Sequence, residues 1–114
     1  MVKKQELQSI DEMANDCYLQ LIGANNESIF SVYTLSSYVA DAVIWTEHFK
    51  WRGQTKKRIV MKTFEIIIDN HISDEEESIA KTWYQKELGN IIDGFIFVAK
   101  AKEFVKRSCF SILY

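Results

Sequence analysis

Acidic side chains in the second half of the chain are the residues best suited to hold a divalent metal ion. Four of them are consecutive, from Asp74 to Glu77, and Glu87 and Asp93 follow further along. Carboxylates three or four residues apart lie on one side of a helix, where they can share Mg²⁺ with substrate phosphates.

The acidic pairs also resemble a known pattern. MazG-type and all-α dUTPase-type nucleotide pyrophosphohydrolases hold Mg²⁺ with E-x-x-E on one helix and E-x-x-D on another. Here Asp74-x-x-Glu77 is similar to the first pair, and either Glu87-x-x-Asn90 or Asn90-x-x-Asp93 is similar to the second, with one carboxylate missing. The resemblance implies an all-α pyrophosphohydrolase with Mg²⁺ as its cofactor and with Glu77, Glu87 and Asp93 as the candidate metal ligands.

The same acidic run is typical of a helix start. In Ser73-Asp74-Glu75-Glu76, the Ser73 hydroxyl and the Glu76 carboxylate can form a capping box, and the acids suit the positive end of the helix dipole. We favour this interpretation over the enzymatic one. The resulting solvated acidic patch consists of Asp74, Glu75, Glu76 and Glu77.

Nucleophilic catalysis has little support in the sequence. There is no G-x-S-x-G motif, no P-loop and no dinucleotide-binding glycine motif. The cysteines, Cys17 and Cys109, stand near opposite ends of the chain, and neither His48 nor His71 can be placed beside one of them. We predict that the cysteines are small buried hydrophobic residues and that the histidines lie at the surface or at helix ends. We assign no catalytic residue and, outside the enzymatic alternative, no cofactor.

A basic segment with aromatic neighbours occupies the middle of the chain. From His48 to Lys62 there are six basic residues and no acidic one. Basic side chains contact phosphates and aromatic rings stack on unpaired bases, so single-stranded nucleic acid is a candidate partner. The net charge of −2 argues against general nucleic-acid binding, and a protein partner is the alternative. The candidate partner-binding residues are Trp45, Phe49, Lys50, Trp51, Arg52, Lys56, Lys57 and Arg58.

The charge changes sign directly after the basic segment. Six acids and no lysine or arginine occupy the stretch from Glu65 to Glu77. Opposed blocks of charge steer and orient a partner, and they permit self-association.

Hydrophobic periodicity predicts the elements that carry these residues. Apolar residues three and four apart indicate helices over 3–22, 28–51 and 56–72, and another from 73 to the C-terminal end. Together they predict an all-α fold, a single compact antiparallel bundle of four to five helices over residues 1–114. The β-branched and aromatic content leaves an α+β alternative, in which residues 43–67 form a hairpin.

Local signals refine the ends of these helices. We expect Gly23 to end the first helix and Thr55 to cap the third, after a break at Gly53. The stripe of the last helix that is expected to face the core contains Tyr84, Leu88, Ile91, Phe95 and Val98. The apolar residues 109–114 are expected to dock on the core.

Composition bounds the class of protein. With 114 residues, 47% of them apolar, and no proline, the chain is suited to one globular domain, and disordered and disulfide-scaffold classes are excluded. The N-terminus lacks the apolar region of a signal peptide, and the most apolar run, residues 29–45, is short for a membrane span. We expect an intracellular protein.

These observations favour a small non-enzymatic module that binds a protein partner or assembles with itself. Its binding surface would be an apolar helix face together with the segregated charge. Small helical inhibitors, immunity proteins and phage or viral accessory or capsid-associated proteins are similar in this general character.

Overall fold

The computed structural model describes residues 2–24 and 30–100, and the regular elements within these ranges are helices. Helix α1 spans Val2–Ala24, α2 spans Leu35–Glu47, α3 spans Gly53–His71 and α4 spans Asp74–Trp83. A π-helical segment, η1 (Tyr84–Leu88), follows α4 directly, and residues 89–100 continue as α-helix. The predicted all-α fold is confirmed. The alternative hairpin over residues 43–67 does not form, because this stretch contains the end of α2 and most of α3.

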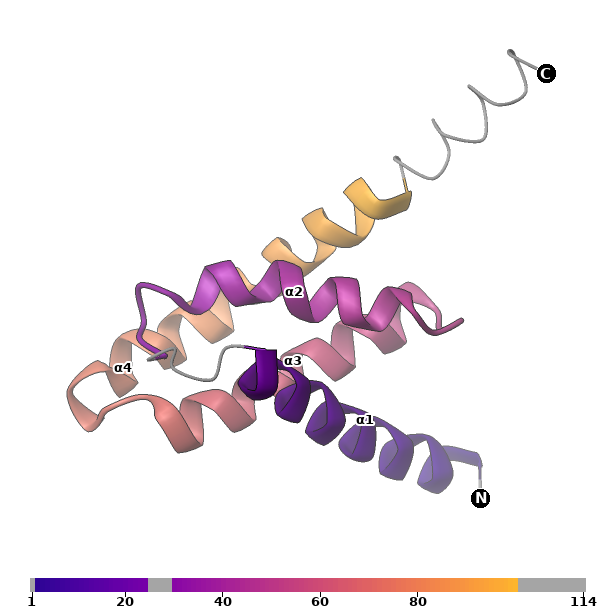
Figure 1. Cartoon of the computed structure of the whole chain (residues 1–114), viewed down its shortest axis with the longest axis horizontal. Coiled ribbons are helices and arrows are strands. Elements are labelled where there is room, and N and C mark those ends of the chain that lie inside the picture. Colours follow the sequence, from indigo (N-terminus) through magenta and orange to yellow (C-terminus); the bar gives the residue numbers. More distant parts are fainter. Residues whose placement is uncertain (1, 25–29, 101–114) are drawn as a thin grey trace, which may run out of the picture.

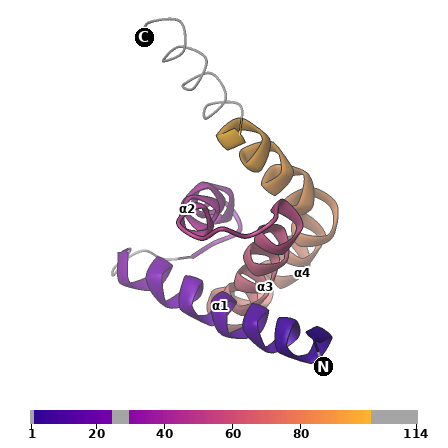
Figure 2. The same cartoon turned by 90° about the vertical axis from the view of Figure 1, so that its right-hand side faces the viewer.

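Helix α3 is the central element of the bundle. Helices α1, α2 and α4 and the segment η1 all pack against it. Figure 1 shows α1 crossing α3, and α2 running antiparallel to it. In Figure 2, α2 is seen nearly end-on above α1, and residues 89–100 extend beyond the other helices. No helix in the described ranges is long and apolar enough to cross a membrane.

The core uses the stripes predicted for the first three helices. Within each helix the buried residues recur at spacings of three and four, which is the periodicity expected for one face of an α-helix. The predicted residues that are at most 4% exposed are Ala14, Cys17 and Leu21 in α1, Leu35, Val39, Ala42 and Thr46 in α2, and Val60, Phe64 and Ile67 in α3.

Two predicted helix ends are wrong. Gly23 lies inside α1, and none of the described glycines has the positive φ that a glycine helix stop requires. Arg52, not Thr55, is the N-cap of α3, and Gly53 is its first residue. The Lys56 N–H donates to the Arg52 carbonyl over 3.0 Å, so the helix begins three residues earlier than its apolar stripe suggests.

The π-helical segment η1 changes the register of the last helix. Trp83 and Leu88 are both buried, at 8% and 0% exposed, although they are five residues apart. In an α-helix such residues point about 140° away from each other, at about 100° per residue. The wider turn of η1 brings both to the core.

The predicted core stripe is therefore wrong beyond η1. Ile92 and Ile96 are buried there, at 0% and 7% exposed. Phe95 and Val98, which were expected in the core, are 37% and 47% exposed. The predictions for Cys109 and for residues 109–114 lie outside the described residues.

Candidate functional site

The aromatic members of the predicted partner site form one cluster between α2 and α3. The rings of Phe49 and Trp51 are stacked, with centroids 4.3 Å apart and planes 15° apart. Trp45 tilts against both rings, at 4.9 Å from Phe49 and 6.5 Å from Trp51. All three side chains are half-buried, because the cluster closes the turn between the helices. Ring contacts within the protein therefore occupy much of the surface that would stack on a base.

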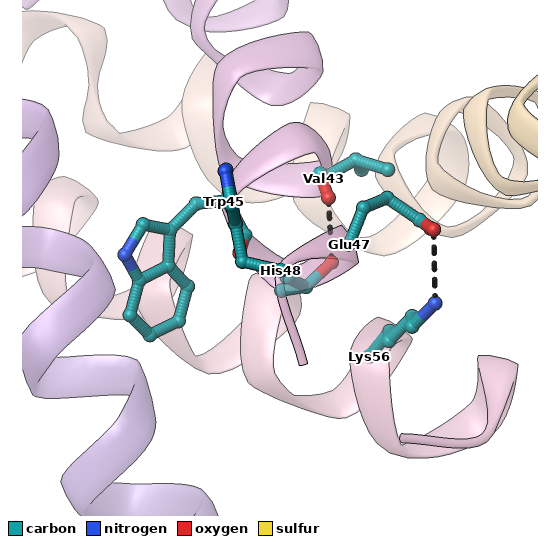
Figure 3. A network of polar contacts seen from close by, with 6 residues as sticks. Val43, Trp45, Glu47, His48 and Lys56 are labelled. Atoms are coloured by element: carbon teal, nitrogen blue, oxygen red, sulfur yellow. Dashed lines mark hydrogen bonds and ion pairs between the residues drawn. The ribbon is translucent and has the colours of Figure 1, made fainter. Parts of the chain in front are cut away.

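Lys56, a second member of the predicted site, is turned into the protein. Its Nζ lies 3.1 Å from Oε2 of Glu47, the last residue of α2, and its side chain is only 10% exposed. Figure 3 shows this ion pair between Glu47 and Lys56. In the same turn of α2, the Thr46 hydroxyl donates to the Val43 carbonyl over 2.6 Å. Lys56 is buried at this contact while Glu47 remains exposed, and the ion pair links the end of α2 to the first turn of α3.

The remaining basic residues of the predicted site lie away from the aromatic cluster or at its edge. Lys50 is exposed. Lys57 Nζ contacts Asp93 Oδ2 at 2.9 Å, and Arg52 lies beside it on the same cavity. Arg58 lines a neighbouring cavity. The structure thus uses the aromatic residues and Lys56 for contacts within the protein, and it places Arg52, Lys57 and Arg58 on two adjoining cavities.

The acidic patch begins α4, as expected, but the two side-chain hydrogen bonds of the predicted capping box do not form. Ser73 is the N-cap of α4 and makes no side-chain cap hydrogen bond. Glu76 does not reach back to Ser73, and its Oε2 accepts a hydrogen bond from the Val32 N–H over 3.3 Å. Asp74 and Glu75 are exposed, and Glu77 pairs with Lys81 over 2.7 Å.

The three candidate metal ligands do not converge in the structure. Glu77 and Asp93 are each engaged by a lysine, Lys81 and Lys57 respectively. Glu87 lines a groove that contains neither of them. Among the described residues, no group of three or more histidine, cysteine or acidic side chains is placed to hold a metal ion.

A groove between the start of α2 and the α4–η1 helix was not predicted. Its volume is about 510 Å³. The Glu76 hydrogen bond to Val32 holds the segment before α2 against α4, and Tyr33 and Ile79 line the same groove. The residues that line the groove are Val32, Tyr33, Ser36, Ser78, Ile79, Thr82, Trp83, Lys86 and Glu87.

Large apolar side chains surround this α2–α4 groove. Tyr33 is 86% exposed, and Ile79 is 55% exposed although isoleucine is a type that proteins usually bury. Trp83 lies beneath them at 8% exposed and packs edge-on against Phe64, with ring centroids 5.7 Å apart. In the described residues, the Trp83 indole nitrogen is buried without a hydrogen-bond partner.

A signal for this groove is present in the sequence. Tyr33 and Ile79 are apolar residues that fall off the core-facing stripes of their segments, so they represent apolar content that the bundle does not bury. The sequence does not show the hydrogen bond between Glu76 and Val32, which holds the segment of Tyr33 against α4. Comparisons with protein-family models, with curated proteins and with solved structures find no match to this chain.

Proposed function

We propose that the protein is a small protein-binding module and that the α2–α4 groove is its docking site. The observation that carries this proposal is the pair of exposed apolar side chains, Tyr33 and Ile79, over the nearly buried Trp83. Tyrosine and tryptophan are the residue types most enriched among those that dominate binding energy at protein interfaces.

The lining of the groove indicates the chemistry of the partner. One lysine, Lys86, and one glutamate, Glu87, lie at its edge, so the groove has no net charge. Hydroxyl groups of Ser36, Ser78 and Thr82 offer hydrogen bonds near the apolar side chains. A segment of another protein with two or three apolar side chains and free backbone polar groups fits this lining best.

The size of the groove agrees with such a segment. A cavity of about 510 Å³ is within the range that holds small ligands or a few side chains. Contacts around its rim would have to supply the rest of a standard interface of about 800 Å² per partner.

Site-directed photo-crosslinking tests the proposal. Benzoylphenylalanine replaces Tyr33 in the full chain, and the same residue at Leu19 of α1, which is 55% exposed, is the matched control. In extracts of cells that naturally produce the protein, we expect one discrete adduct from position 33 and none from position 19. Ile79→Asp should abolish that adduct, because it places a charge in the apolar groove.

Folding of the variant has to be separated from binding. Ile79 is exposed, so Ile79→Asp should leave the thermal midpoint nearly unchanged. Once mass spectrometry has identified the adduct, the purified partner should bind Ile79→Asp at least about tenfold more weakly than the original chain. Equal crosslinking at positions 19 and 33, or an adduct that survives Ile79→Asp, would contradict the proposal. An adduct with twice the mass of the chain would assign the groove to self-association instead.

A further inference from the structure

A second cavity, of about 620 Å³, lies where the start of α3 meets residues 93–100. Three cationic side chains line it and come from different parts of the fold. Arg52 is the N-cap of α3, Lys57 lies one turn into α3, and Lys100 lies on the last described turn of the chain. The arrangement is independent of the α2–α4 groove and shares no residue with it.

Positive charge in this cavity is incompletely balanced. Among the described residues that line it, Asp93 is the one acid, and it is engaged by Lys57 over 2.9 Å. Neither Arg52 nor Lys100 forms an ion pair with another described residue. Cations that converge without counter-charge repel one another, and a bound anion removes that repulsion.

Lys100 approaches the α3 backbone closely. A Cβ atom built on Gly53 would lie 3.5 Å from Lys100 Nζ and 3.7 Å from Ile96 Cγ2. The ammonium group therefore lies over the first turn of α3, whose free N–H groups and dipole add further positive potential. The positive potential of this helix end disfavours the Lys100 ammonium group, and an anion bound between them would be attracted to both.

An adjoining cavity extends the site. Its volume is about 720 Å³, and it shares Gln54 and Lys57 with the cationic cavity. Apolar and aromatic side chains of Ile10, Met61 and Tyr84 line it, and its acids, Asp11 and Glu65, largely balance its cations. This cavity suits the uncharged part of a molecule whose anionic group occupies the first cavity.

We propose that the two cavities together bind a small phosphomonoester that carries an apolar or aromatic group. The phosphate lies among Arg52, Lys57 and Lys100, and the uncharged group lies against Met61 and Tyr84. Guanidinium and ammonium groups form charge-assisted hydrogen bonds to phosphate oxygens, and Arg52 can do so through two parallel bonds. A small molecule fits better than nucleic acid because the cations surround one cavity and do not form an extended stripe.

Titration with phenyl phosphate and with inorganic phosphate at low ionic strength tests this inference, with binding followed by calorimetry and amide chemical shifts. Phenyl phosphate should bind more tightly than inorganic phosphate, and Met61→Ala should remove most of that difference. Arg52→Gln and Lys100→Gln should each weaken phenyl phosphate about tenfold, the loss expected for a hydrogen bond to a charged group. Lys50→Gln is the matched control, because Lys50 is exposed and lines neither cavity. It should change the affinity by less than about twofold.

Removing negative charge from the cationic cavity should strengthen the binding of phenyl phosphate. Asp93→Asn removes the one carboxylate of the cationic cavity and releases Lys57, so it should tighten phenyl phosphate binding about fivefold. Asp69→Asn removes the same charge outside both cavities and should have little effect. Equal weakening by Arg52→Gln and Lys50→Gln, or no binding of either phosphate, would overturn the inference. Binding of a single-stranded oligonucleotide without binding of phenyl phosphate would assign the basic residues to nucleic acid instead.

Discussion

Cys17 belongs to a reactive residue type, but its position makes it unreactive. It is fully buried between α1 and α3 and forms no disulfide. Burial raises its pKa to about 11, and a hydrogen bond with the Thr63 side chain offsets part of that rise. The Thr63 hydroxyl donates to the Ile59 carbonyl over 2.7 Å and lies 3.3 Å from the Ala14 carbonyl. At neutral pH the thiol is protonated, so the prediction of a small buried hydrophobic residue is confirmed for Cys17.

The raised pKa of Cys17 predicts a loss of stability in alkaline solution. The unfolded thiol loses its proton near pH 9, while the folded thiol keeps it to about pH 11. The unfolded state therefore binds fewer protons between these values, and the free energy of unfolding falls as the pH rises. The loss attributable to Cys17 should be on the order of 2 kcal/mol between pH 9 and 11.

Urea unfolding at several pH values measures this loss. The comparison is between Cys109→Ser and the double variant Cys17→Ala, Cys109→Ser, so that titration of lysine and tyrosine side chains cancels. We expect the steeper decline above pH 9 in the variant that keeps Cys17. Parallel pH profiles for the two proteins would show that Cys17 titrates normally in the folded state.

Lysine is a residue type suited to binding a partner, but Lys56 forms a contact within the protein. The basic run around it suggests a solvated surface for a partner. Its ammonium group instead pairs with Glu47, and the side chain is only 10% exposed. Residues 47 and 56 meet because α2 and α3 are antiparallel neighbours joined by a short turn. Lys56 stands four residues before Val60, on the buried stripe of α3, whereas Lys57 falls off that stripe and lines a cavity. The sequence does not show that Glu47 is the partner of Lys56.

At the scale of elements, the π-helical segment decides which face of the last helix is buried. Along the sequence, Tyr84, Ile91, Phe95 and Val98 fit an uninterrupted α-helical stripe. The extra residue accommodated in η1 rotates everything that follows, so Ile92 and Ile96 face the core. Such segments equal one inserted residue in an α-helix, and they are frequent at functional sites. Here Tyr84 of the segment lines the cavity next to the cationic one, and Lys86 and Glu87 line the α2–α4 groove.

Deleting one residue from η1 should be tolerated. Gln85 is exposed, and without it Trp83 and Leu88 would be four residues apart, the spacing of an α-helix. The chain after Leu88 would keep its phase. We expect the deletion of Gln85 to leave the free energy of unfolding within about 1 kcal/mol of the original value.

Deletion of Asn90 is the matched control. Asn90 is also exposed, but its removal rotates Ile92 and Ile96 by about 100° and takes them out of the core. This deletion should cost more than about 3 kcal/mol in urea unfolding. If both deletions destabilise the protein equally, η1 does not act as a one-residue insertion.

At the scale of the whole molecule, the two proposed sites lie in different regions of the bundle. The cationic cavity is at the N-terminal end of α3, within the basic segment from His48 to Lys62. The α2–α4 groove is formed by residues of α2, α4 and η1, near the acidic start of α4. A net charge of −2 therefore conceals two regions of opposite sign.

Separation of the sites predicts that they act independently. Substitutions at residues that share no partner usually have additive effects, and Ile79 lines neither cavity of the phosphomonoester site. Arg52→Gln with Lys100→Gln should leave crosslinking from position 33 unchanged, and Ile79→Asp should leave the affinity for phenyl phosphate unchanged within about twofold. Both measurements use the assays described above. A change of more than about tenfold in either would instead reveal coupling of 1.4 kcal/mol or more between the two regions.

The sequence by itself favoured a helical chain and determined most of the core residues of α1, α2 and α3. Burial on one face of a helix imposes a spacing of three and four residues, and that spacing can be read without knowing any partner helix. Only the tertiary structure decided the register after Trp83, the pairing of Lys56 with Glu47, and the groove that Tyr33 and Ile79 both line. The register depends on a change of helix type, and the ion pair and the groove depend on contacts between different helices. Neither kind of cause leaves a periodic signal in the local sequence.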